Sequence, residues 1–214
     1  MSDSSDDGAR PKSGVSRRGF LKGVGLGSVA IPAAGLLGGS VVLAEEAPPK
    51  PSGPKVFTGE IPIKLRINGK DHDLKVEPRT TLLNALRDRL DLTGSKLVCD
   101  RGTCGACSVI MDGLLVTSCM VLAIDAQGKE ITTIEGLASG DKLDPIQAAF
   151  IEFDALQCGF CTPGLIMATK SLLKTNPHPT REEMQDALSG NICRCGTYDH
   201  IFAAIEKVAG GARG

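Results

Sequence analysis

Four cysteines between positions 99 and 119 constrain this chain more than any other feature of the sequence. Cys99, Cys104 and Cys107 follow the spacing Cys-x4-Cys-x2-Cys, and Cys119 completes the group. This spacing is typical of a plant-type 2Fe-2S site, in which thiolates from a tight loop converge on two irons. The group therefore predicts a cluster that is held by all four cysteines.

Two glycines lie inside the cysteine loop. Gly102 and Gly105 give the backbone the freedom to wrap around a cluster, and exposed N–H groups of such a loop can donate to its sulfur atoms. A closed zinc site or two disulfides are the alternatives. Zinc sites favour paired short Cys-x2-Cys knuckles, and this loop has a different spacing.

The composition of the whole chain excludes some functions. The 214 residues carry a net charge of -1 and include one tyrosine and no tryptophan. A chain without a basic patch or an aromatic stacking platform is not expected to bind nucleic acid. Its eight cysteines fall into two groups of four, the number of ligands that an iron–sulfur or zinc centre uses. We interpret the three scattered histidines as ordinary surface or packing residues.

The first 44 residues resemble a Tat-type export signal. Twin arginines, Arg17 and Arg18, precede an uncharged stretch from Gly23 to Ala44, and the small residues at its end allow cleavage after Ala44. The alternative is a membrane anchor, because the uncharged stretch is long enough to span a bilayer. Six glycines within it make it weakly hydrophobic and poorly helical, which favours a removed signal.

A Tat-type signal predicts that the protein reaches the periplasm already folded. Exported proteins usually oxidise their cysteines to disulfides, whereas iron–sulfur clusters need reduced thiolates at assembly. Export after folding allows an exported protein to keep reduced thiolates for its clusters, because the clusters are then inserted in the cytoplasm. The proline-rich residues 45–60 follow the signal and predict a stiff, extended linker.

Residues 61–140 predict a small sheet with one helix. Alternating apolar and polar residues on both sides of Asn68-Gly69 predict a β-hairpin over Ile61–Val76. Leucines at helical spacing predict a helix over Thr81–Leu90. A second hairpin, which carries Cys119, and one further strand follow. We therefore expect a plant-type ferredoxin domain with the β-grasp arrangement and the cluster loop at one edge.

Residues 141–210 predict four helices. Asp144-Pro145 is an N-cap followed by a proline in the first turn, and a second helix begins at Thr162-Pro163. Thr180 with Glu183 forms a capping box for a third helix, and a fourth runs from Tyr198 to Val208. The chain as a whole is therefore expected to be α+β, with a β-grasp ferredoxin domain followed by a four-helix domain.

The second group of four cysteines lies in the helical segment. Cys158 and Cys161 are spaced Cys-x2-Cys, and Cys193 and Cys195 are spaced Cys-x-Cys. Taken alone, this pattern would favour zinc, since a short knuckle is common at zinc sites. The neighbouring ferredoxin loop shifts the prediction to a second 2Fe-2S cluster.

Three segments together resemble one family. CDRGTCGACSV, FDALQCGFCTPGL and SGNICRCGTY are similar to the iron–sulfur subunit of molybdenum hydroxylases, the xanthine dehydrogenase and aldehyde oxidoreductase group. The resemblance spans Ile61 to Val208. Two departures occur: Gly196-Thr197 stands in the reverse of the usual order, and Val98 replaces a common glycine.

The resemblance implies a specific arrangement of cofactors. The cluster of the helical domain would lie next to a molybdopterin on a separate large subunit, with Gln157 and the backbone near Cys195 in contact with the pterin. The cluster of the ferredoxin domain would face FAD on a third subunit or an external electron acceptor. The family reaction implied by the aldehyde oxidoreductase members is the oxidation of an aldehyde to a carboxylic acid.

The chain itself has no G-x-G-x-x-G fingerprint for a flavin and no acid–base constellation. We therefore expect an electron-transfer subunit whose catalytic site lies on a partner chain. A free-standing exported ferredoxin-like electron carrier is one alternative, and a zinc-stabilised structural protein is another.

Overall fold

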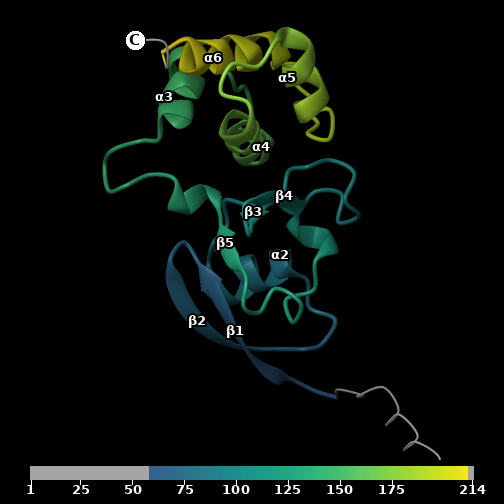
Figure 1. The fold of residues 1–214 in the computed structure, drawn as a ribbon. Coiled ribbons are helices and arrows are strands. Elements are labelled where there is room, and N and C mark those ends of the chain that lie inside the picture. The colour runs from purple at the N-terminus through teal and green to yellow at the C-terminus, as the bar shows by residue number, and fades with distance from the viewer. Residues whose placement is uncertain (1–57, 212–214) are drawn as a thin grey trace, which may run out of the picture. The chain divides into compact units, whose positions relative to one another are not determined.

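The computed structural model describes residues 58–211, which all belong to one compact unit, Ser52–Gly214. Strands come first along this part of the chain and long helices last, so the expected α+β class is confirmed (Figure 1). The predicted signal at residues 1–44 and most of the predicted linker at 45–60 lie outside the described residues. Within residues 58–211, no helix combines the length and the hydropathy that a bilayer crossing requires.

Five strands form one mixed sheet in the order β2-β1-β5-β3-β4. The pair β1–β5 is parallel, and the other three pairs are antiparallel. The strands are β1 (Ile61–Ile67), β2 (Lys70–Val76), β3 (Ser108–Met111), β4 (Leu114–Thr117) and β5 (Glu130–Thr132). Both predicted hairpins and the further strand are confirmed.

The first hairpin turns at Asn68 and Gly69, as predicted. Both residues have positive φ, 51° and 76°, which is the geometry that a two-residue turn matching the strand twist requires. The side chain of Asn68 also binds the residue directly after β5, because its Oδ1 accepts from the N–H of Thr133 at 2.9 Å. The turn is therefore anchored to the segment that follows β5.

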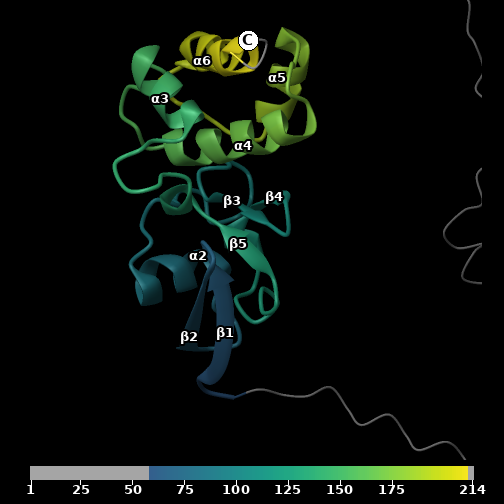
Figure 2. The same ribbon diagram turned by 60° about the vertical axis from the view of Figure 1, so that its left-hand side comes forward.

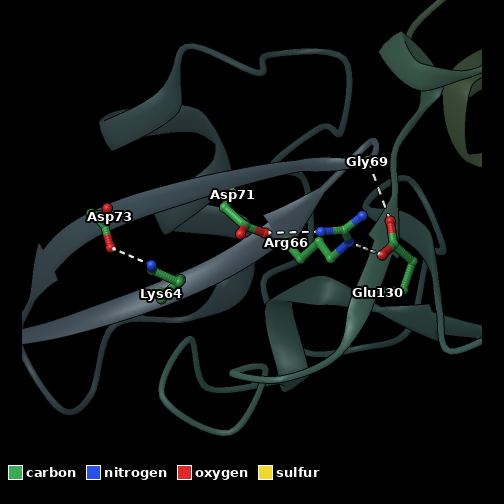
Figure 3. A network of polar contacts seen from close by, with 6 residues as sticks. All are labelled: Lys64, Arg66, Gly69, Asp71, Asp73 and Glu130. Atoms are coloured by element: carbon green, nitrogen blue, oxygen red, sulfur yellow. Dashed lines mark hydrogen bonds and ion pairs between the residues drawn. The ribbon is translucent and has the colours of Figure 1, made fainter.

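Charged side chains on the exposed face connect β2, β1 and β5 (Figure 3). Arg66 on β1 bridges Asp71 on β2 at 3.3 Å and Glu130 on β5 at 2.6 Å, and Lys64 pairs with Asp73 at 3.6 Å. All of these side chains are about half exposed or more, so each pair contributes little stability. Their main effect is to favour the observed register, in which Arg66 lies opposite Asp71 and Glu130.

The helix expected over Thr81–Leu90 differs in part from the prediction. Thr81 caps a short α-helix, α2 (Leu82–Asn84), and the chain then widens into a π-helical segment over Ala85–Arg89. The apolar stripe is preserved through this change, since Leu82, Leu83 and Leu86 are completely buried. The leucine spacing therefore predicted the buried face correctly, but it did not predict the change from an α-helix to a π-helical segment.

Four helices fill the C-terminal part, as predicted: α3 (Pro145–Glu152), α4 (Thr162–Thr175), α5 (Arg181–Leu188) and α6 (Tyr198–Gly211). Both helix starts with a predicted cap are confirmed, and α3 and α5 each begin with a full capping box, Asp144 with Gln147 and Thr180 with Glu183. The last helix extends three residues beyond the expected end at Val208.

Helix α4 contacts both halves of the described chain. In Figures 1 and 2 it lies between strands β3 and β4 on one side and the helices α3, α5 and α6 on the other. Gly164 on α4 faces the cysteine loop so closely that a Cβ atom there would lie 2.3 Å from the carbonyl oxygen of Gly105. The helical part is thus packed directly against the loop that carries the first cysteine group.

Candidate metal centres

The first cysteine group lies in the loop before β3 and in the turn after β4. Cys107 and Cys119 are buried and contact the fully buried Leu83 of α2, whereas Cys99 and Cys104 are partly exposed. Cys119 was expected on a strand but occupies a 3₁₀ turn, Ser118–Met120. The turn directs the chain back toward the loop, where the N–H of Gly102 donates to the sulfur of Cys119 at 3.3 Å.

The second group lies in the two loops that join the helices. Cys158 and Cys161 lie between α3 and α4, with Cys161 at the N-cap position of α4, and Cys193 and Cys195 lie between α5 and α6. The sulfur atoms of Cys158 and Cys195 are 3.5 Å apart, although 37 residues separate them in the sequence. The fold therefore brings the two expected pairs of cysteines to one place.

Within each group the thiols lie close to one another. The sulfur of Cys195 donates to that of Cys158 at 3.5 Å. The pairs Cys99 with Cys104, Cys107 with Cys119, and Cys161 with Cys193 are close enough for one thiol to shift the pKa of the other. A four-cysteine 2Fe-2S cluster uses two thiolates for each iron. Two pairs in each group therefore fit two irons in each group.

This arrangement of the thiols fits disulfide bonds or a zinc site less well than it fits a cluster. All eight cysteines are free thiols, and the 3.5 Å between Cys158 and Cys195 exceeds the length of a disulfide bond, about 2.05 Å. A zinc ion needs four ligands around a single centre. Neighbouring thiols that lie in pairs instead suit two irons, each with two thiolate ligands.

A buried hydroxyl next to the second group also fits a cluster. Thr162 follows Cys161, and its Oγ1 is buried with no hydrogen-bond partner in the described part of the chain. A buried hydroxyl without a partner is costly. Inorganic sulfide bound by this group would bring acceptor atoms to this end of α4.

The free thiols differ in pKa because their surroundings differ. Hydrogen bonds from the hydroxyl of Thr103 and the backbone of Arg101 lower the pKa of Cys99 to about 6. Burial raises the pKa of Cys119 to about 11. Since metal binding requires thiolates, Cys99 is ready to bind near neutral pH, whereas Cys119 must be deprotonated by the metal itself.

The same contrast occurs in the second group. Burial raises the pKa of Cys161 to about 12. Burial also favours a higher pKa for Cys193. Hydrogen bonds from the hydroxyl and the backbone of Thr197 oppose this effect, and the pKa of Cys193 is lowered to about 7. Each group thus contains one thiol that ionises readily and one that is held protonated by burial.

A short segment connects the two groups. The N–H of Ile192 donates to the carbonyl oxygen of Cys104 at 3.0 Å, and the next residue is Cys193. Asn191 is 4% exposed, and its Nδ2 donates to the carbonyl oxygen of Gly105 at 2.9 Å. The loop that presents Cys193 is therefore bound directly to the loop that presents Cys104.

Tyr198 holds the connecting segment in place. Its hydroxyl accepts from the N–H of Cys193 at 2.8 Å and donates to the carbonyl oxygen of Asn191 at 3.1 Å. The phenol ring stacks with Phe202 on the next turn of α6. Helix α6 therefore fixes the conformation of the loop before it.

The predicted pterin contacts lie on the surface of the second group. Gln157 and Cys195 are both exposed, and Gln157 directly precedes Cys158. A cavity of about 170 Å³ lies beside Cys158, and it is lined by Cys104, Cys158 and Cys161 together with Arg194 and apolar side chains. Three of those apolar side chains are about half exposed: Val98 (54%), Phe160 (52%) and Ile192 (51%).

Two family profiles match the described residues in succession. The "2Fe-2S iron-sulfur cluster binding domain" matches residues 65–132, and the "[2Fe-2S] binding domain" matches residues 133–206. The aldehyde oxidoreductase iron-sulfur-binding subunit PaoA of Escherichia coli O157:H7 is 44% identical over 198 residues, which cover 86% of this chain and 85% of PaoA. The chain belongs to the iron–sulfur subunits of the molybdenum hydroxylase family.

Solved structures agree with this membership. A chain of quinoline 2-oxidoreductase from Pseudomonas putida 86 matches this iron–sulfur subunit with a TM-score of 0.70 and 44% identity, over 73% of this chain and 98% of that one. The aldehyde oxidoreductase of Megalodesulfovibrio gigas is 41% identical over 68% of this chain but only 16% of its own length. The iron–sulfur subunit thus has an electron-transfer role, and catalysis takes place on a partner subunit.

Sequence reasoning missed several residues of this iron–sulfur subunit. Asn191 and Tyr198 lie within the motif SGNICRCGTY, but nothing in their spacing indicates that they hold the two cysteine groups together. Thr103 and Thr197 were also missed as hydrogen-bond partners of cysteine sulfur. Each threonine lies within a few residues of the cysteine that it contacts, and this closeness is the signal that could have found them.

Proposed function

We propose that this chain passes electrons one at a time from a molybdopterin site on a large subunit, through two 2Fe-2S clusters, to FAD on another subunit or to an external acceptor. The reaction served would be the oxidation of an aldehyde to a carboxylic acid; the relative PaoA is named as a subunit of an aldehyde oxidoreductase. The observation that carries the proposal is the gathering of eight free thiols into two groups of four, in the second of which the sulfur atoms of Cys158 and Cys195 approach to 3.5 Å.

The proposed ligands follow from the two groups. Cys99, Cys104, Cys107 and Cys119 would hold the cluster of a β-grasp ferredoxin domain over residues 61–140. Cys158, Cys161, Cys193 and Cys195 would hold the cluster of a four-helix domain over residues 141–210. When bound, each cluster supplies a site that accepts and releases a single electron. The chain contributes the thiolates, the N–H donor of Gly102 and the apolar surroundings that set the potential.

The second group is the better candidate for the side that faces the pterin. Cys158, Cys195 and Gln157 are exposed, so a partner can reach them, whereas Cys107 and Cys119 of the first group are buried. Electrons would then enter at the helical domain and leave through the ferredoxin domain. The contact between Ile192 and Cys104 lies between these two points.

The exposed apolar side chains around the second group support a docked large subunit. Val98, Phe160 and Ile192 would lose contact with water in such a complex. In the M. gigas aldehyde oxidoreductase, the matching segment is 16% of a longer chain, so there it is joined covalently to further protein. A separate large subunit would take that place here.

Metal and subunit analysis of the purified complex tests the proposal. We expect about four irons and four inorganic sulfides per chain, two of each for each cluster, and two distinct paramagnetic signals after reduction. The chain should copurify with a large molybdenum-containing subunit. Zinc in place of iron would support a structural protein instead, and two clusters on a chain that purifies alone would support a free-standing electron carrier.

We also propose that residues 1–44 are a Tat-type signal and that the mature protein is periplasmic. The match to PaoA covers 86% of the chain, whereas residues 58–214 make up about 73% of it (157 of 214). The similarity therefore reaches into the N-terminal region.

Changing both Arg17 and Arg18 to lysine should leave a cluster-loaded protein in the cytoplasm, because the export machinery reads the twin arginines. Cell fractionation with iron analysis of each fraction measures this effect. Arg10→Lys makes the same chemical change outside the motif and should be exported normally. Normal export of the double variant would refute the signal.

A further inference from the structure

The reversed pair Gly196-Thr197 forms a tight turn after the second cysteine group. The N–H of Gly196 donates to the carbonyl oxygen of Cys193 at 3.4 Å, and Gly196 has a φ of 79°. A β-branched residue would be strained at that φ, so glycine suits position 196 and threonine suits position 197. The order that departs from the usual motif is therefore the order that this backbone accommodates.

The turn brings the hydroxyl of Thr197 to a cysteine sulfur. Thr197 Oγ1 lies 3.3 Å from the sulfur of Cys193, a hydrogen-bond distance for sulfur. The carbonyl oxygen of Thr197 accepts from the N–H of Ile201 at 3.1 Å, which fixes the residue at the start of α6. The N–H of Cys193 is already bound to Tyr198, so it leaves the sulfur to other donors.

The direction of this hydrogen bond is settled once a metal is bound. A thiolate ligand carries no proton, so its sulfur can accept but cannot donate. The hydroxyl of Thr197 must then be the donor. Cys193 is only 7% exposed, so few water molecules compete for its sulfur.

We propose that Thr197 raises the reduction potential of the cluster in the helical domain by donating a hydrogen bond to the sulfur of Cys193. The inference rests on the proposed function, since it assumes that the second group holds a 2Fe-2S cluster. Reduction adds one negative charge to the cluster, and a donor directed at a ligand sulfur stabilises the reduced form more than the oxidised form. Thr197 thus favours the flow of electrons onto this cluster from the partner.

Thr197→Val tests the inference, because it removes the hydroxyl and keeps the shape of the side chain. A redox titration of the purified complex, followed by electron paramagnetic resonance, should show the midpoint potential of one cluster shifted to a more negative value. The affected signal should be the one that Cys193→Ser abolishes. Thr197→Ser keeps the hydroxyl and should restore the original potential.

Thr169→Val is the matched control. Thr169 is fully buried on α4, eight residues beyond Cys161, and its hydroxyl has no hydrogen-bond partner among the described residues. This variant should leave both midpoint potentials unchanged. Thr197→Ala is a second variant without the hydroxyl, to be measured if the valine disturbs the start of α6.

The possible failures are distinguishable. A wild-type complex without two cluster signals would contradict the proposed function before any variant is examined. If the wild-type complex shows both signals but the valine and alanine variants leave both potentials unchanged, or shift both equally, the role of Thr197 is refuted.

Discussion

Cys193→Ser should remove one cluster and leave the other intact. Iron is expected to fall from about four to about two atoms per chain, and one of two paramagnetic signals should disappear. Cys193 belongs to the core of the helical part, together with residues such as Leu188 and Ile201. Cys107 and Cys119 of the first group lie in a separate cluster with Leu83, and serine at position 193 keeps the backbone that binds the loop of Cys104, so the ligands of the first group are not altered by the change.

The complementary variant is Cys107→Ser, which should remove the other signal and leave the one that Cys193→Ser abolishes. Iron analysis and spectroscopy of the two variants side by side then assign each signal to a domain. Loss of both signals in either variant would contradict two independently held clusters.

Gly105→Ala should destabilise the protein strongly. Gly105 has a φ of 68°, and a Cβ there would lie 2.5 Å from Nδ2 of Asn191 and 2.5 Å from the carbonyl oxygen of Gly190. A left-handed conformation costs an alanine about 1–2 kcal/mol, and overpacking typically adds about 1–3 kcal/mol. We therefore expect the free energy of unfolding to fall by about 2–5 kcal/mol, which urea or thermal unfolding would measure.

Gly128→Ala provides the matched control. Gly128 has nearly the same φ, 74°, but no atom lies within 4 Å of the position of its Cβ. It should therefore lose only the conformational contribution, about 1–2 kcal/mol. Equal losses at the two positions would show that the contact between Asn191 and the cysteine loop is not tight.

The parts of the fold that were predicted correctly depend on neighbours in the sequence. The turn at Asn68-Gly69 and the capping box of Thr180 with Glu183 are satisfied within a few residues, so their local pattern determines them. The helix over Thr81–Leu90 was predicted less well. Its leucine spacing specified a buried face, but the same face is buried by the π-helical segment that the structure contains.

In the candidate sites, too, some features follow from the local sequence and others depend on tertiary packing. The two groups of four cysteines are visible from spacing alone, and their role as cluster ligands stays a prediction. The contacts between individual thiols could not be predicted. Helices α4 and α5 lie between Cys158 and Cys195 in the sequence, so these two cysteines meet only after the helices have packed. The hydrogen bond from Asn191 to Gly105 spans 86 residues and depends on the packing of α4 against the cysteine loop.

The hydrogen bond from Ile192 to Cys104 has a consequence for how this protein can move. A tunnelling rate decreases exponentially with distance, so a relay works only while donor and acceptor keep a constant separation. Here a single backbone contact interrupts an otherwise covalent path from the sulfur of Cys104 to that of Cys193. If the two cysteine groups hold the proposed clusters, a hinge between the two halves of the chain would break this path. We therefore expect the two halves to move as one rigid body, with any opening motion during turnover in the partner.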